Sequence, residues 1–93
     1  MISTPPFDLD EATYFAHVLG VSEQVDAAEL CRGMNVELEH GRRDPLTDVT
    51  GDDPLVTAKI ALAHLREMPD YYTRLARMEA DAGVERVDRK SVV

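Results

Sequence analysis

Apolar residues recur every three or four positions along four segments of this chain, which is the spacing of one face of an α-helix. The clearest case is VDAAELCRGMNVELEHG, where Ala27, Leu30, Met34 and Leu38 fall on one side of the predicted helix. A period of two, which indicates a strand, is confined to a few residues near the C-terminus. The predicted helices are therefore 11–19, 25–41, 54–68 and 70–82.

Residues that typically start and stop helices lie at the ends of the two central segments. Asp26 with Glu29 three positions later resembles a capping box, with Asp in place of Ser or Thr. Gly41 is a natural C-cap for the same helix. Asp53 followed by Pro54 is typical of an N-cap and a first helical position. Both central helices thus have boundaries predicted by local chemistry.

The two outer segments carry similar signals. Asp8 or Asp10 can cap the first helix, and Gly20 suits its end. Pro69 stops the third helix and begins the fourth, which Gly83 would end.

The loop 42–53 joins the second and third predicted helices and is rich in acids. These acids lack the spacing of an EF-hand, so we expect them to serve turns and caps rather than calcium.

The apolar stripes also predict which residues are buried. Leu9 belongs to the stripe of the first helix, and Tyr71, Leu75 and Met78 would supply the buried face of the fourth. The third helix is apolar on two sides, which is typical of a central helix. Gly33 lies inside the second helix, where it costs about 1 kcal/mol relative to alanine. Such a glycine indicates that a neighbouring helix approaches closely.

These patterns predict an all-α fold, a compact bundle of four helices with a polar N-terminus and a short C-terminal tail. The 93 residues correspond to one domain, 1–93, with a core of about 8–83 and a tail of 84–93. A domain of this size buries roughly 60% of the surface of its unfolded chain, which allows one modest core. The tail reads as either a short strand or a disordered segment.

Eighteen acidic against ten basic residues give a net charge of −8, which repels phosphate backbones and argues against nucleic-acid binding. The single cysteine, Cys31, cannot form an intrachain disulfide and favours a reducing compartment. No signal peptide or membrane-spanning apolar run is apparent. We expect a cytoplasmic protein with no membrane association, whose partner is another protein or a second copy of the chain.

Candidate chemistry lies in two pairs of acid and imidazole. Glu37 and His40 form an E-x-x-H pair, and His64 and Glu67 form an H-x-x-E pair. Residues three apart are neighbours on a helix, so each pair converges on one side. On a helical wheel Glu37 lies between apolar positions, whereas Glu39 lies on the opposite, solvated side. We therefore expect Glu37 to be buried, Glu39 to be exposed and the two pairs to meet.

Three interpretations of this cluster stay open. The favoured one is a binding or structural module in which a buried Glu/His/Tyr network, including Tyr71 or Tyr72, fixes helix packing without a cofactor or metal. The alternative is a metal-binding protein, because carboxylates and imidazoles from facing helices can hold a divalent transition metal. The lowest-ranked is a metal-free enzyme with His40 or His64 as general base. The alternative metal ligands are Glu37, His40, His64 and Glu67.

At these residues the chain resembles an uncharacterised family of small bacterial and archaeal proteins and phage-encoded segments, known as a domain of unknown function. The pattern is G-x-x-x-E-x-E-H followed by H-L-x-E-x-P-x-Y-Y-x-x-L, from CRGMNVELEHG through TRLARME, about half of the chain. The resemblance implies a shared fold and no particular activity. Its recurring positions fall here on Gly33, Glu37, Glu39, His40, His64, Leu65, Glu67, Pro69, Tyr71, Tyr72 and Leu75.

The chain departs from that pattern in two places. Related phage segments often join the two halves by a much shorter linker, so the loop 42–53 is dispensable to the pattern. They also often carry Asp immediately before the second histidine, where this chain has Ala63. An acid–histidine dyad at that point is therefore not expected here.

Overall fold

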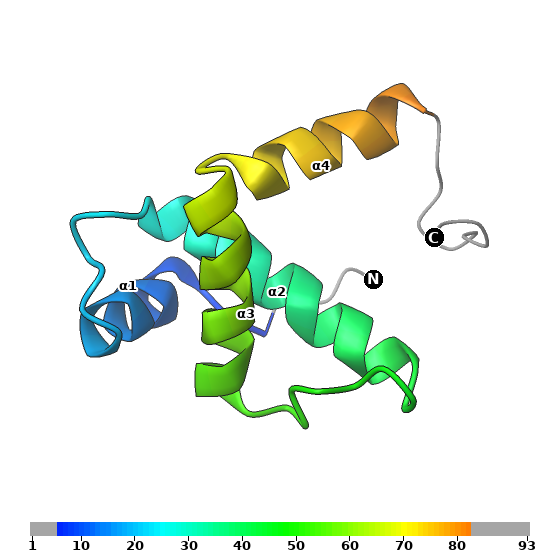
Figure 1. Ribbon diagram of the computed structural model, residues 1–93, viewed down its shortest axis with the longest axis horizontal. Coiled ribbons are helices and arrows are strands. Elements are labelled where there is room, and N and C mark those ends of the chain that lie inside the picture. The colour runs from blue at the N-terminus through cyan, green and yellow to red at the C-terminus, as the bar shows by residue number, and fades with distance from the viewer. Residues whose placement is uncertain (1–5, 83–93) are drawn as a thin grey trace.

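The structure is a computed structural model that describes residues 6–82 of the 93-residue chain (Figure 1). It contains four helices, α1 (Leu9–Val18), α2 (Ala27–Arg43), α3 (Pro54–Glu67) and α4 (Tyr71–Asp81). No strand occurs within residues 6–82, so the predicted all-α fold of four helices is confirmed. The tail 84–93, for which a strand or disorder was expected, lies outside the described residues, as does Gly83.

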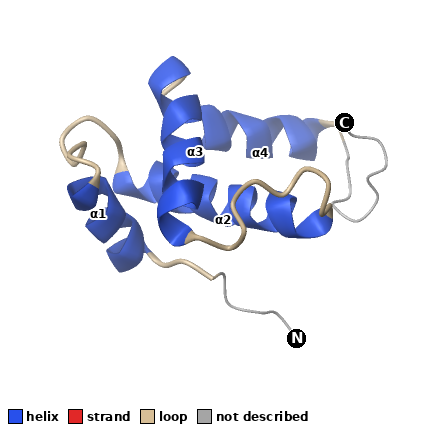
Figure 2. Ribbon diagram, turned by 60° about the horizontal axis from the view of Figure 1, so that its bottom comes forward, coloured by secondary structure: helices blue, strands red, loops and turns tan. Residues whose placement is uncertain are grey.

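The helices are arranged around the α2–α3 pair. Both α2 and α3 pack against every other helix, whereas α1 and α4 do not contact each other. Figure 1 shows α3 crossing α2, with α1 beside the beginning of α2 and α4 leading away from the end of α3. Figure 2 shows α4 and α2 overlapping in projection, whereas Figure 1 shows that they diverge beyond the first part of α4. Every helix that could position a polar site therefore converges near the α2–α3 crossing.

The core is built largely from small side chains where α2 and α3 cross. Ala58 and Ala61 of α3 are fully buried, and Leu30 and Met34 of α2 fill the space around them. The buried face of α3 follows residues 57, 58, 61 and 65 and includes the hydroxyl side chain of Thr57. Small residues let helix axes approach closely, because little volume separates the two backbones.

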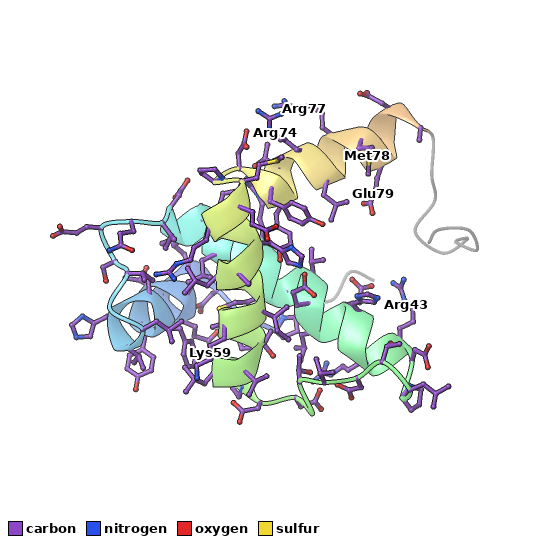
Figure 3. The ribbon with its side chains drawn as sticks, viewed as in Figure 1. Arg43, Lys59, Arg74, Arg77, Met78 and Glu79 are labelled. Carbon is purple, nitrogen blue, oxygen red and sulfur yellow. The ribbon has the colours of Figure 1, made fainter. Side chains whose placement is uncertain are left out.

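The prediction that Leu9 and Met78 are buried is wrong. Both side chains are exposed, although both lie on helical apolar stripes. Leu9 is the first residue of α1, and Met78 lies in the C-terminal half of α4, away from the α2–α3 crossing (Figure 3). The buried residue of α4 is Tyr72, while Tyr71 and Leu75 are partly buried against the core. Periodicity marked the apolar face of α4 but not how far the neighbouring helices cover it.

The predicted N-caps of the first three helices are present. Asp8 forms a full capping box with Glu11, in which each side chain accepts a backbone N–H of the other residue at 2.9 Å. Asp26 caps α2 through the Ala28 amide, and Asp53 caps α3 with Pro54 in the first turn. These contacts satisfy amide groups that have no partner within the helix.

The expected end of α2 at Gly41 is wrong, because the helix continues to Arg43. Gly41 is buried because the following loop folds back over it. A β-carbon at this position would lie 2.9 Å from Asp48 Oδ1 and 3.1 Å from Thr50 Oγ1. The glycine therefore makes room for the loop rather than terminating the helix.

The loop from residue 44 to 53 is organised by its own acids, as expected of turn formers. Asp48 Oδ1 accepts hydrogen bonds from the amides of Thr50 and Gly51 and from the Thr50 hydroxyl. The Gly51 amide is the main reason that the pKa of Asp48 is lowered from its ordinary value. Asp52 pairs with Arg42 at 2.9 Å. The acids of this loop are thus engaged in turns, caps and an ion pair.

None of the helices in the range 6–82 combines the length and the apolar character needed to cross a membrane.

Candidate functional site

The residues of the candidate site come from α2, α3 and the start of α4. Glu37 lies on the side of α2 that faces these helices, and only 14% of its side chain is exposed. Glu39 lies on the opposite side, with 63% of its side chain exposed. The predicted contrast between the two acids is confirmed, which fixes the rotational phase of α2 relative to the core.

The Glu37 carboxylate is held by Tyr72 at the start of α4. The Tyr72 hydroxyl donates a hydrogen bond of 2.8 Å to Glu37 Oε2. His64 Nε2 of α3 lies 3.7 Å from the same oxygen. The expected meeting of Glu37 with a tyrosine of the fourth helix is therefore confirmed, and one oxygen joins three helices.

Burial, followed by the hydrogen bond to Glu37, raises the pKa of Tyr72 far above its ordinary value. Both effects disfavour a phenolate, because the ring is desolvated and faces a carboxylate. The Tyr72 hydroxyl is therefore favoured in the neutral form that donates the hydrogen bond to Glu37.

His64 also packs against both tyrosines. Its ring stacks on Tyr71 with centroids 4.6 Å apart and planes 8° from parallel. Tyr72 meets His64 edge-on at 6.0 Å and Tyr71 edge-on at 4.9 Å. Such offset and edge-to-face contacts add to the energy of buried area, so the three rings form one packed aromatic group.

The other half of each predicted pair stays outside this group. His40 and Glu67 are exposed, and within residues 6–82 neither makes a hydrogen bond or an ion pair with Glu37 or His64. A spacing of three places two side chains on one side of their helix, but it does not bring both of them into contact with the same neighbouring helix. The expected meeting of the two pairs is therefore made by Glu37 and His64, while His40 and Glu67 take no part in these contacts.

The four-residue ligand set of the metal alternative does not assemble. In the described part of the chain no three His, Cys, Asp or Glu side chains are grouped closely enough to hold a metal ion. Among the four proposed ligands, the acid–imidazole contact within residues 6–82 is that of Glu37 Oε2 with His64 Nε2. Transition-metal sites in proteins generally use three or four protein ligands, which this junction does not supply.

A second acid, Glu29, performs a role that the sequence analysis did not predict. Its side chain is almost fully buried and accepts hydrogen bonds from the amides of Tyr72 at 3.1 Å and Thr73 at 3.3 Å. The Thr73 hydroxyl and Arg32 also donate to this carboxylate. Glu29 of α2 thus caps the beginning of α4, where Asp70 makes no side-chain cap. The predicted capping box at Asp26 is wrong for this reason.

One signal in the sequence could have revealed Glu29. It precedes Gly33 by four positions, and Glu37 follows Gly33 by four, so the three residues form one stripe along α2. Gly33 marks the point of closest approach. A β-carbon there would lie 2.8 Å from Tyr72 Cδ2 and 2.9 Å from the Ala61 β-carbon. The predicted close approach at Gly33 is confirmed, with a carboxylate on each side of it.

Cys31 is separate from this junction. Its thiol contacts the Phe7 carbonyl oxygen at 3.5 Å, on the side of α2 that faces the N-terminal segment. Burial, with Asp8 and Glu11 nearby, raises the pKa of the thiol. Because the thiolate is the nucleophilic form, this environment favours an inert packing role.

A cavity of about 200 Å³ adjoins the junction, between α2, α3 and the loop that connects them. Among residues 6–82, Glu37 is the one carboxylate that lines it, and no lysine or arginine of this range does so. The lining residues are Glu37, His40, Gly41, Thr47, Val49, Thr50 and Ile60.

The fold and junction define a small all-α domain with acid–tyrosine contacts between three helices. The family model described as a protein of unknown function, DUF5661, matches residues 9–81, and the chain belongs to this family. The match is longer than the motif-based resemblance, because it also includes α1. Neither a curated protein nor a solved structure matches the chain.

Proposed function

We propose that this protein is a binding module without catalytic chemistry, in which a lock holds α4 on α2 and α3. The lock consists of Glu37, His64, Tyr71 and Tyr72. The observation that carries the proposal is the hydrogen bond from the Tyr72 hydroxyl of α4 to Glu37 Oε2 of α2, an oxygen that also lies 3.7 Å from His64 Nε2 of α3. In this hydrogen bond the acid and the tyrosine serve to hold two helices together.

The physical argument for a lock rests on the cost of burying charge. A carboxylate withdrawn from water is destabilising unless it accepts hydrogen bonds. Glu37 meets this requirement with a tyrosine hydroxyl and Glu29 with backbone amides, and both partners belong to α4. The two acids therefore fix where α4 begins and how it is rotated, which is a structural use of side chains that could otherwise do chemistry.

The binding role is supported by the surface. Several large apolar side chains are exposed on residues 6–82, and the net charge of −8 opposes contact with nucleic acid. We propose another protein or a second copy of the chain as the partner. Sedimentation velocity over a range of concentrations separates the two, because only self-association gives a concentration-dependent dimer.

A double-mutant cycle tests the lock. Tyr72→Phe keeps the ring and removes the hydroxyl, and Glu37→Ala removes the acceptor. We expect Glu37→Ala to lower the free energy of unfolding by about 1–3 kcal/mol, because it leaves a buried hydroxyl without a partner. The double variant should lose clearly less than the sum of the single losses, by about 0.5–3 kcal/mol.

Glu39→Ala is the matched control, since it removes the same side chain from the exposed side of α2. Its free energy of unfolding should change by less than about 0.5 kcal/mol. Strict additivity of the two lock variants, or a control that loses as much as Glu37→Ala, would contradict the proposal. Urea unfolding followed by circular dichroism measures the four variants and the unmodified protein.

A further inference from the structure

The cavity beside the lock has the form of a site for a small cation. Figure 2 shows the loop between α2 and α3 running back along α2, which encloses this space from one side. Ile60 and Val49 form its apolar side, with 73% of Val49 open to solvent, and Thr47 and Thr50 add hydroxyl groups. Glu37 brings the one carboxylate among the described residues that line the cavity.

Glu37 has capacity left after the lock is formed. Its Oε2 accepts the Tyr72 hydroxyl, but within residues 6–82 no group donates a hydrogen bond to Oε1. An ionised carboxylate has about four acceptor positions, so an added donor would be favourable. The cavity also adjoins Gly41 in the last turn of α2, where the helix dipole is negative. Both features favour positive charge.

We propose that this cavity binds a primary ammonium group carried on an aliphatic stem, as in a lysine side chain. The ammonium would donate to Glu37 Oε1, and the stem would lie against Val49 and Ile60. Water occupies about 30 Å³, so 200 Å³ accommodates about six groups of that size, enough for the four carbons and one nitrogen of butylammonium.

The same geometry selects against a guanidinium group. Arginine binds carboxylates best through two parallel hydrogen bonds, one to each oxygen. In Glu37 the Tyr72 hydroxyl already takes one acceptor position of Oε2, so a guanidinium that binds both oxygens would have to share Oε2 with the tyrosine. A compact ammonium needs only one oxygen. The basic side chains labelled on α4, Arg74 and Arg77, project away from α2 (Figure 3) and leave the site to an external ligand.

This inference deepens the proposed binding role and rests on it, since the lock determines which Glu37 oxygen stays available. The ammonium has two sources, a lysine of a partner protein or a free alkylamine. The shared chemistry is tested first with n-butylammonium chloride, by following the amide signals of Gly41 and Thr50 in nuclear magnetic resonance spectra. Saturating shifts are expected, with several-fold weaker binding of n-butylguanidinium and none of n-butanol.

Two loop variants with equal charge changes provide the decisive comparison. Val49→Lys adds an ammonium at the cavity wall and should abolish saturable binding. Leu46→Lys makes the same change at a residue that is 94% exposed and does not line the cavity, and it should bind like the unmodified protein. Equal loss in both variants, no loss in either, or identical shifts with sodium chloride would overturn the proposal.

The source is resolved by a blocked Ala-Lys-Ala peptide. Tighter binding than n-butylammonium supports a lysine of a protein partner, and equal binding supports a free alkylamine. Both loop variants leave Glu37 and Tyr72 unchanged, so their unfolding should keep the coupling of the lock. A failure of the ammonium site therefore appears in the titrations, and a failure of the lock appears in the unfolding cycle.

Discussion

At the scale of single residues, the molecule depends on one stripe of α2 in which a glycine lies between two buried carboxylates. Glu29 and Glu37 each reach α4, and Gly33 between them lets the Tyr72 ring approach the α2 backbone. The polar contacts and the close packing are therefore coupled, because the ring must fit against Gly33 for its hydroxyl to reach Glu37.

Gly33→Ala tests this coupling. Alanine is the better helix former by about 1 kcal/mol, yet here its β-carbon would lie 2.8 Å from Tyr72 Cδ2 and 2.9 Å from Ala61. We expect a net loss of about 1–3 kcal/mol in the free energy of unfolding from overpacking. Ala63→Gly, at an exposed position inside α3, measures the propensity term. A stabilised Gly33→Ala protein would mean that the ring can shift freely.

Asp48 leads to a separate prediction, which concerns how stability depends on pH in acid solution. Its pKa is lowered in the folded protein, so its contribution to stability is present above the ordinary value of 3.8 and is lost as pH falls through the lower folded pKa. Asp48→Asn should therefore differ from the unmodified protein near neutral pH, and the difference should shrink as pH falls below 3.8. Asp10→Asn controls for the change in net charge, and thermal unfolding at several pH values makes the comparison.

At the scale of elements, α4 differs from the other helices in how it begins. The first three helices carry an N-cap from the residue immediately before them, and α4 takes its cap from Glu29 of α2. Figure 1 shows only the first part of α4 lying against the rest of the molecule. The position of α4 is thus determined at its N-terminal end, where Glu29 holds it.

Glu29→Ala should release this end of α4. The amides of Tyr72 and Thr73 would lose their acceptor in a site that excludes water, so we expect a loss of about 1–3 kcal/mol in stability. Hydrogen exchange of these two amides should accelerate more than that of amides in the middle of α3. Exchange that accelerates equally everywhere would show a global rather than a local effect, and Glu39→Ala serves as the control.

At the scale of the whole molecule, the surplus of acids acts on stability as well as on the choice of partner. A net charge of −8 on 93 residues produces self-repulsion in the compact state. Between about 0.01 M and 0.15 M salt the screening length falls from about 30 Å to about 8 Å.

We therefore expect the free energy of unfolding to rise over this range of sodium chloride. Urea unfolding at each salt concentration measures the trend. Stability that falls as salt is added would instead show that attractive ion pairs, such as Arg42 with Asp52, outweigh the repulsion.

The sequence was sufficient for what depends on local chemistry and periodicity. Asp26 and Asp53 marked helix starts, and the angle between Glu37 and Glu39 identified the buried acid, because these features are set within one or two helical turns. The metal alternative required His40 to join Glu37 and His64, and periodicity could not test this requirement. Whether two neighbours on one helix both reach a second helix depends on the crossing geometry.

Glu29 is a contact that the sequence pattern missed, also because it depends on how two helices pack. A local capping box and a cap donated to a distant helix begin with the same spacing of acids, so the pattern alone cannot separate them. The partner of Glu29 lies 43 positions further along the chain. Only packing of α2 against α4 brings the two together, and that packing depends on residues in all of the intervening structure.

The borrowed cap of α4 has a consequence for the order in which the chain folds. An isolated helix of 11 residues is marginal in water, and this one lacks a side-chain cap of its own. Its first amides acquire a partner only after α2 has formed and a long loop has closed, which carries an entropic cost. We therefore expect α4 to form late in folding, after α2 and α3 have packed together.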